Sequence, residues 1–131
     1  MTDDQPQQFW QGVEQFNTRE FYACHDTLEA LWMEATEPEK TFYQGILQIA
    51  VALYHLGNHN WRGATILLGE GSNRLRRYPS VYGGIDVDEL LEQSAALLRT
   101  LQQTEPEKLA TMKLGKTEGL PLPKIVMGTQ E

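Results

Sequence analysis

Three residues with chemically versatile side chains share one side of an expected helix: His25, Glu29 and Trp32. Their spacing of i, i+4 and i+7 places an imidazole, a carboxylate and an indole along one face, at the edge of an apolar stripe. Burying such polar groups costs free energy unless they are hydrogen-bonded. This face is therefore the first candidate for a functional site.

A second expected helix supplies partners for these side chains, because Gln44, Gln48 and His55 recur at i, i+4 and i+11. If the two helices form an antiparallel hairpin, Gln48 and Gln44 lie close to His25 and Glu29. His55 then lies about 9 Å farther along, toward the start of the first of the two helices. The sequence predicts a polar cluster or ligand pocket composed of His25, Glu29, Trp32, Gln44, Gln48 and His55.

Three kinds of chemistry fit this cluster. The first is a hydrogen-bonded structural network. The second is a metal site in which His25 and Glu29 ligate one ion. The third is an acid–base site in which Glu29 tunes the pKa of His25. Helical metal centres usually use several carboxylates, and the second helix offers amides instead. We therefore expect no metal and no cofactor, with His25 and Glu29 as the residues that would hold an ion. The pattern assigns no catalytic residue.

The single cysteine, Cys24, lies next to His25 in the sequence but points about 100° away around the helix. A Cys–His nucleophilic pair is therefore not expected. One cysteine also forms no internal disulfide and no multi-thiolate metal site. We expect Cys24 to be a small core residue.

Hydrophobic periodicity predicts an all-α fold, a compact bundle of five main helices. Two antiparallel hairpins are followed by a capping helix, and a loop over 79–85 precedes that last helix. The tail over 105–131 is expected to be extended, with a short turn at 107–113. Because it is too apolar for a solvated segment, it should lie against the bundle through Leu120, Leu122, Ile125 and Val126. Thr18, Asn58 or Asn60, and Asp86 are the expected N-caps. The expected helices cover residues 6–16, 18–35, 38–56, 61–78 and 86–104.

Helix 61–78 is rich in small residues, which predicts a close approach to a neighbouring helix because glycine otherwise weakens a helix. The small residues are Gly63, Ala64, Gly69, Gly71 and Ser72.

With 131 residues, the chain suits one domain over 1–131. No apolar run approaches the roughly 18 residues of a membrane span, and no signal peptide is visible, so we expect a cytoplasmic protein with no membrane partner. The net charge of −7 disfavours nucleic-acid binding. The local basic group of Arg74, Arg76 and Arg77 suits the cationic last turn of a helix.

Several short runs of the sequence together form a specific pattern: Phe16-Asn17, His25-Asp26 with Glu29 and Trp32, Gln44-Gly45-Ile46-Leu47-Gln48, Ala50 to His55, Gly57-Asn58, Gly63-Ala64, Leu67-Leu68 and Gly84-Ile85-Asp86. This pattern resembles the family called domain of unknown function 309, DUF309. The resemblance covers residues 12 to 92, and it implies a compact helical bundle without an established activity, mostly in bacteria, archaea and plastids. The family commonly has Glu where this chain has Asp26, and residues 60–62 lengthen one turn.

Two classes of function remain open. The first is a non-enzymatic binding or scaffold protein that engages an unknown protein or small-molecule partner through a groove. The alternative is a small enzyme or metal-binding protein that uses His25 and Glu29. Apolar residues outside the helical stripes, namely Val81, Tyr82, Ile85 and the tail leucines, also suggest a homodimer.

Overall fold

A computed structural model describes residues 5–104 and 121–128 and confirms the all-α prediction. The expected turn at 107–113 and the tail residue Leu120 lie outside the described residues. The elements are α1 (Gln7–Asn17), α2 (Phe21–Glu34), α3 (Glu39–Gly57), α4 (Trp61–Leu75), β1 (Val81–Tyr82), β2 (Ile85–Asp86) and α5 (Val87–Gln103).

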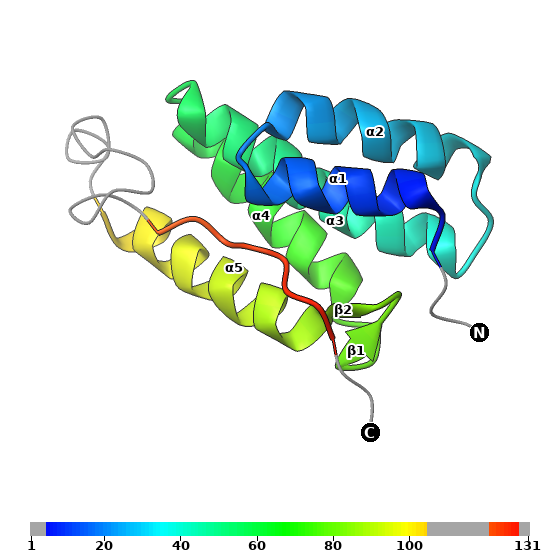
Figure 1. Ribbon diagram of the computed structural model, residues 1–131. Coiled ribbons are helices and arrows are strands. Elements are labelled where there is room, and N and C mark those ends of the chain that lie inside the picture. Colours follow the sequence, from blue (N-terminus) through cyan, green and yellow to red (C-terminus); the bar gives the residue numbers. More distant parts are fainter. Residues whose placement is uncertain (1–4, 105–120, 129–131) are drawn as a thin grey trace.

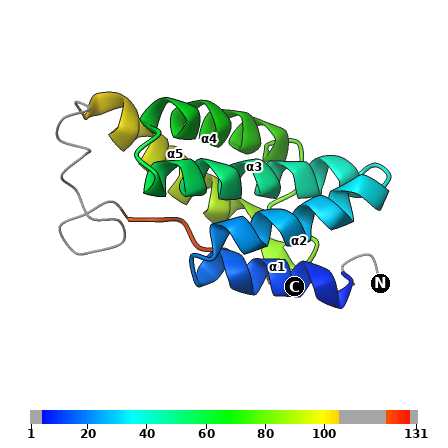
Figure 2. The same cartoon turned by 90° about the horizontal axis from the view of Figure 1, so that it is seen from above.

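Each helix runs antiparallel to the one before it (Figures 1 and 2). The central helix is α3, which packs mainly against α2 on one side and α4 on the other. Its sequence is apolar nearly all round, as expected of a helix with neighbours on several sides. Because α2 and α3 are direct neighbours, side chains from both helices contribute to a common outer face.

Two of the predicted N-caps are confirmed. The Asn60 side chain accepts a hydrogen bond from the Gly63 amide at 3.0 Å, and the Asp86 side chain accepts one from the Glu89 amide at 2.9 Å. The prediction for Thr18 is wrong. Its amide and its hydroxyl both donate to the Glu14 carbonyl, so this residue closes α1 instead of opening α2.

The predicted close approach of α4 occurs at one of its glycines. A Cβ atom on Gly71 would lie 2.7 Å from the Gly45 carbonyl oxygen and 2.9 Å from a side-chain carbon of Ile49, both on α3. Gly69, by contrast, has nothing within 4 Å of a Cβ position, so it does not serve this contact. Helices α3 and α4 therefore pack so closely at Gly71 that only a hydrogen atom fits in place of a side chain.

The predicted loop over 79–85 contains a small β-hairpin. Strand β1 pairs antiparallel with β2, and the turn between them is formed by Gly83 and Gly84, with φ of 61° and 82°. Two glycines between β-branched and aromatic residues are a known hairpin signal, because such tight turns need positive φ. The two glycines are visible in the sequence, but strands of two residues each are too short to show the alternating pattern that predicts a strand.

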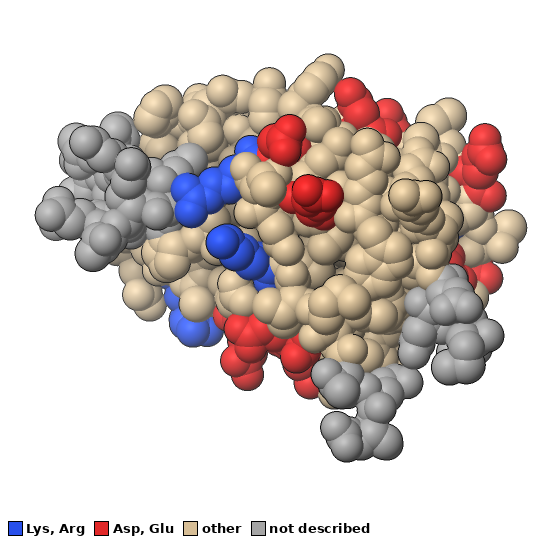
Figure 3. All heavy atoms as spheres, in the orientation of Figure 1, with Lys and Arg blue, Asp and Glu red and all other residues tan. Residues whose placement is uncertain are grey.

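The tail is extended over residues 121–128 and lies between α1 and α5 (Figure 1). Ile125 is only 4% exposed, which confirms that the tail packs against the bundle, whereas Val126 is 41% exposed and does not contribute to the core as expected. Residues other than Lys, Arg, Asp and Glu make up most of the surface on this side of the molecule (Figure 3).

The position of the tail excludes one hairpin residue, Ile85, from the apolar surface expected to support a homodimer. Ile85 is fully buried, and Met127 of the tail pairs with it as an isolated β-bridge. Ile85 is therefore covered by its own chain and is not free to contact a second copy.

The two α4 glycines provide a matched test of the helix contact. Gly71→Ala should lower the free energy of unfolding by up to about 2 kcal/mol, because overpacking costs roughly 1 to 3 kcal/mol and the helix preference of alanine returns about 1 kcal/mol. Gly69→Ala, in open space, should raise it by about 0.5 to 1 kcal/mol. Urea unfolding of both variants measures the two changes in the free energy of unfolding. Equal changes would contradict the close packing of α3 and α4 at Gly71.

Candidate binding surface on helices α2 and α3

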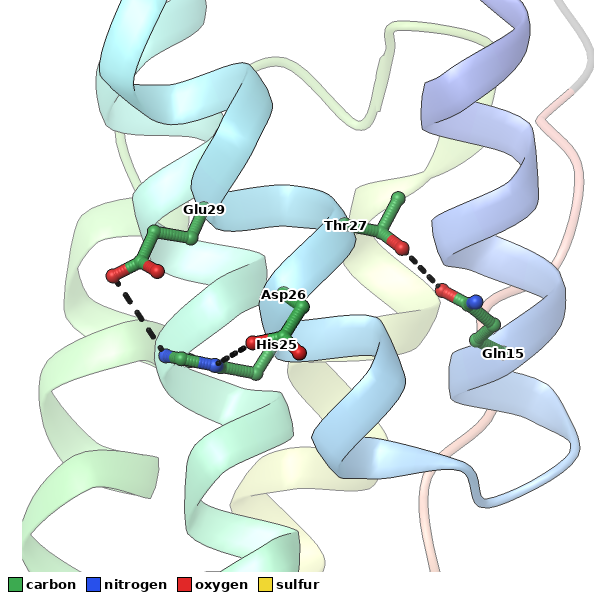
Figure 4. A network of polar contacts seen from close by, with 5 residues as sticks. All are labelled: Gln15, His25, Asp26, Thr27 and Glu29. Carbon is green, nitrogen blue, oxygen red and sulfur yellow. Dashed lines mark hydrogen bonds and ion pairs between the residues drawn. The ribbon is translucent and has the colours of Figure 1, made fainter.

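His25 is flanked by two carboxylates on the exposed side of α2 (Figure 4). Its Nδ1 lies 3.2 Å from Oδ1 of Asp26, and its Nε2 lies 4.0 Å from Oε2 of Glu29. The side chains of His25, Asp26 and Glu29 are 29%, 61% and 46% exposed, respectively. The predicted pair of His25 and Glu29 is thus present, and Asp26 is an additional member that makes the shorter contact.

The arrangement of these groups bears directly on their chemistry. One ligand atom from each residue lies within 4.8 Å of the others. However, Asp26 and Glu29 contact opposite nitrogens of the imidazole ring, and the two ring nitrogens point in diverging directions. A single ion can bind only one of these nitrogens. The geometry favours hydrogen bonding and charge pairing around His25 over convergent binding of a metal.

Two tyrosines extend this cluster across both helices. The Tyr22 ring stacks beside the His25 ring, with centroids 6.1 Å apart and planes at 27°. It also contacts the ring of Tyr54 on α3, with centroids 5.5 Å apart. Tyr22 is 59% exposed and Tyr54 is 40% exposed. We call the surface made by Tyr22, His25, Asp26, Glu29 and Tyr54 the α2–α3 face.

Neither tyrosine is among the site residues predicted from the sequence. Tyr22 precedes His25 by three residues, so the helical spacing that linked His25 to Glu29 also places Tyr22 on this side of α2. Tyr54 lies in a run of α3 that is apolar nearly all round, which favours a buried position. It is nevertheless 40% exposed, whereas Leu53 and Leu56 beside it are 1% exposed, so it lies on the outer side of α3.

An open groove of about 450 Å³ adjoins the tyrosines. It lies where the turn between α1 and α2 meets the end of α3 and the tail. Most of its exposed lining is apolar, and its main lining residues are Phe21, Tyr22, Leu53, Tyr54 and Leu122.

The predicted glutamine partners do not join His25 and Glu29. The Gln48 amide faces α4, where its Oε1 accepts a hydrogen bond from Arg74 Nε at 2.8 Å and its Nε2 donates to Glu70 at 3.3 Å. A Cβ atom on Gly71 would lie 3.1 Å from the Gln48 Cβ, so the side chain leaves α3 beside α4. The expected contact with α2 is therefore wrong.

Gln44 is half-buried, and its side chain makes no hydrogen bond to another residue within 5–104 and 121–128. It therefore adds no observed polar contact to the His25 cluster.

Trp32 and His55 make no hydrogen bond, ion pair or ring contact with His25 in the described part of the chain, although the His55 ring lies 6.3 Å from the Tyr54 ring. Lys40 covers the Trp32 ring, with its Nζ 4.4 Å from the ring centroid, and donates a hydrogen bond to the Trp32 carbonyl at 2.7 Å. The Trp32 indole N–H is buried and has no hydrogen-bond partner among the described residues. His55 uses its carbonyl to accept hydrogen bonds from Asn58 and Asn60 at the end of α3.

Cys24 is fully buried, as predicted for a small core residue. Burial raises the pKa of its thiol to about 12. The thiolate, the reactive form of cysteine, is therefore rare at neutral pH. Cys24 and His25 do not act as a nucleophilic pair.

Comparison with known sequences identifies the segment that carries the α2–α3 face. The sequence model of the family described as "Domain of unknown function (DUF309)" matches residues 9–67. The chain matches the DUF309 family over this segment. The match confirms the resemblance over α1, α2, α3 and the first half of α4, while the hairpin, α5 and the tail lie beyond it.

Two bacterial relatives extend the similarity. The uncharacterized protein YpuF of Bacillus subtilis (strain 168) is 33% identical over 113 residues, which cover 84% of this chain and 60% of the Bacillus protein. An uncharacterized protein of Aquifex aeolicus (strain VF5) is 25% identical over 95 residues, which cover 72% of this chain and 28% of that protein. The chain thus spans less than two thirds of either relative's length.

None of the helices within residues 5–104 and 121–128 has both the length and the apolar character needed to cross a bilayer.

The state of Cys24 can be tested by thiol labelling. At pH 8, a pKa near 12 leaves on the order of one thiol in ten thousand ionised. The native protein should therefore react with a disulfide reagent at least 100-fold more slowly than the same protein in denaturant. Rapid labelling of the folded chain would show that Cys24 is accessible and would reopen the nucleophile hypothesis.

Proposed function

We propose that this protein is a non-enzymatic binding protein that acts in the cytoplasm and engages a partner protein through the α2–α3 face. The observation that supports this most directly is the pair of exposed tyrosine rings, Tyr22 and Tyr54, in contact across two helices. Tyrosine is enriched in protein interfaces, where a large rigid ring is buried and its hydroxyl finds a polar partner. The adjoining groove adds apolar surface to the same region.

The charges around the tyrosines favour a cationic partner. Helix α2 carries three carboxylates, Asp26, Glu29 and Glu34, and no lysine or arginine. Within residues 5–104 and 121–128, the ion pairs of Asp26 and Glu29 are both with His25. Both carboxylates therefore keep exposed oxygen atoms beside aromatic rings.

A lysine- or arginine-rich segment of another protein matches this surface in two ways. Its charged groups pair with the carboxylates, and they also favour the faces of tyrosine rings, at about 0.5 to 1 kcal/mol for an exposed contact. Its long aliphatic stems can pack on the apolar groove while the charged ends remain in solvent. We therefore infer a basic peptide segment as the ligand class.

Binding of a labelled decapeptide of alternating lysine and alanine tests this proposal. Asp26→Asn with Glu29→Gln should raise the Kd about 5- to 30-fold, because each exposed charge pair is worth roughly 0.5 to 1 kcal/mol. Tyr22→Leu with Tyr54→Leu keeps apolar bulk, removes the aromatic faces, and should weaken binding severalfold. Fluorescence anisotropy at low salt gives the dissociation constants.

A matched control separates this face from the general acidity of the chain. Glu14→Gln with Glu92→Gln also removes two negative charges, but from exposed positions on α1 and α5, and should change the Kd less than twofold. Equal losses of affinity in both double variants would mean that peptide binding depends on the net charge of the protein. The α2–α3 face would then not be the binding site.

A second candidate function is metal binding or acid–base catalysis at His25. The observation in its favour is the presence of His25, Asp26 and Glu29 ligand atoms within 4.8 Å of one another. With Nδ1–H donated to Asp26, the Nε2 atom is left as the basic nitrogen, facing Glu29 and solvent. The opposed directions of the ring nitrogens make this candidate the weaker one.

Elemental analysis decides the metal alternative. Protein purified without tags or chelators, together with His25→Ala and Glu29→Ala, should contain no stoichiometric metal if the face binds a peptide. Stoichiometric zinc, iron or manganese in the parent chain, lost in both variants, would instead establish a metal centre on α2 and replace the binding proposal.

A further inference from the structure

The tail is held to the helices by two side-chain amides that each contact the main chain of one residue. Asn17, the last residue of α1, accepts a hydrogen bond from the Ile125 amide at 2.7 Å and donates to the Ile125 carbonyl at 2.8 Å. Gln93 of α5 accepts from the Lys124 amide at 2.9 Å, and its Nε2 lies 3.5 Å from the Lys124 carbonyl oxygen. These contacts hold an extended backbone whatever its side chains.

The β-hairpin binds the same segment from its other end. The Asp86 amide donates to the Val126 carbonyl at 2.9 Å, and the Gly128 amide donates to the Gly84 carbonyl at 3.0 Å. Met127 pairs with Ile85 as an antiparallel bridge, so the tail is added to the edge of the hairpin. Addition of a strand to a sheet edge is a recurring way in which proteins bind extended peptides.

Over residues 123–126 the side chains of the tail alternate between buried and exposed positions, and the alternation ends at Met127, which is 67% exposed. Pro123 and Ile125 are buried, whereas Lys124 and Val126 are exposed. This is the period of two that an extended strand produces. Two apolar side chains, Pro123 and Ile125, and a run of main-chain hydrogen bonds therefore account for the recognition.

We propose that the groove between α1 and α5 is a binding site for an extended segment with a Pro-X-Ile pattern, which residues 121–128 occupy in this chain. The ligand is a partner segment in which a proline is followed two residues later by a β-branched aliphatic residue. This site adjoins the α2–α3 face, because Leu122 of the same segment lines the groove beside Tyr22 and Tyr54. Its main-chain contacts involve Asn17, Gln93 and the hairpin and no residue of that face, so the inference does not rest on the function proposed for it. The chain's own tail competes with such a segment at an effective concentration on the order of millimolar, because it is tethered.

The experiment uses the full chain with Ile125→Asp, which places a carboxylate where a buried apolar side chain belongs and so releases the tail. The probe is a labelled peptide with the sequence of residues 121–128. The peptide should bind the Ile125→Asp chain at least tenfold more tightly than the parent chain, whose groove is filled. A peptide with the same Ile-to-Asp change should not bind.

A second variant locates the binding. Asn17→Leu in the Ile125→Asp chain removes the two hydrogen bonds to the peptide backbone and should weaken peptide binding at least fivefold. Equal binding by the parent and Ile125→Asp chains, or no binding by a folded Ile125→Asp chain, would overturn the proposal.

If circular dichroism shows that Ile125→Asp does not fold, the parent chain provides the test. The amide resonance of Ile125 is followed while the peptide is added to millimolar concentration. Displacement of the tail by the matching peptide and not by a scrambled one supports the site. An unchanged resonance overturns it.

Discussion

The approach of α3 and α4 at Gly71 is the constraint on which the arrangement of the other helices depends. A Cβ atom at this position would lie 2.7 Å from the Gly45 carbonyl oxygen, so the two backbones meet with no side chain between them. This contact fixes how α3 is rotated about its own axis. Gln48 is thereby directed to α4, and Tyr54 is left beside α2, where it contacts Tyr22. The composition of the α2–α3 face follows from a glycine on a different helix.

Helical spacing was sufficient to predict one part of this face and insufficient for the rest. His25 and Glu29 belong to one helix, so their proximity follows from the i, i+4 relation alone. The position of Gln48 depends on the rotation of α3, which is set by close packing with α4 and is not encoded in the spacing of polar residues. The prediction that α2 and α3 form a hairpin was correct, but a hairpin does not determine which side chains of α3 face its partner.

The fold as a whole was more predictable than the site, because helix number, helix order and two of the caps depend on local signals. Asn60 and Asp86 illustrate this, since each caps a helix that begins at the next residue. The position of the tail could not be derived in this way. Its main anchor joins Asn17 to Ile125, which are 108 residues apart, and the sequence offers only the apolar character of the tail as a signal.

The two proposed surfaces recognise different features of a polypeptide and occupy different parts of the chain. The α2–α3 face lies entirely within the DUF309 match over residues 9–67 and presents side chains, chiefly rings and carboxylates. The side-chain hydrogen bonds that hold the tail come from Asn17 within that segment and from Gln93 of α5 beyond it, and the hairpin, which also lies beyond it, binds further main-chain groups. Salt screens exposed charge pairs strongly and affects main-chain hydrogen bonds beside buried apolar side chains much less. Ionic strength therefore distinguishes the two modes of binding in one chain, because an interaction at the α2–α3 face weakens as salt is added while one in the tail groove persists.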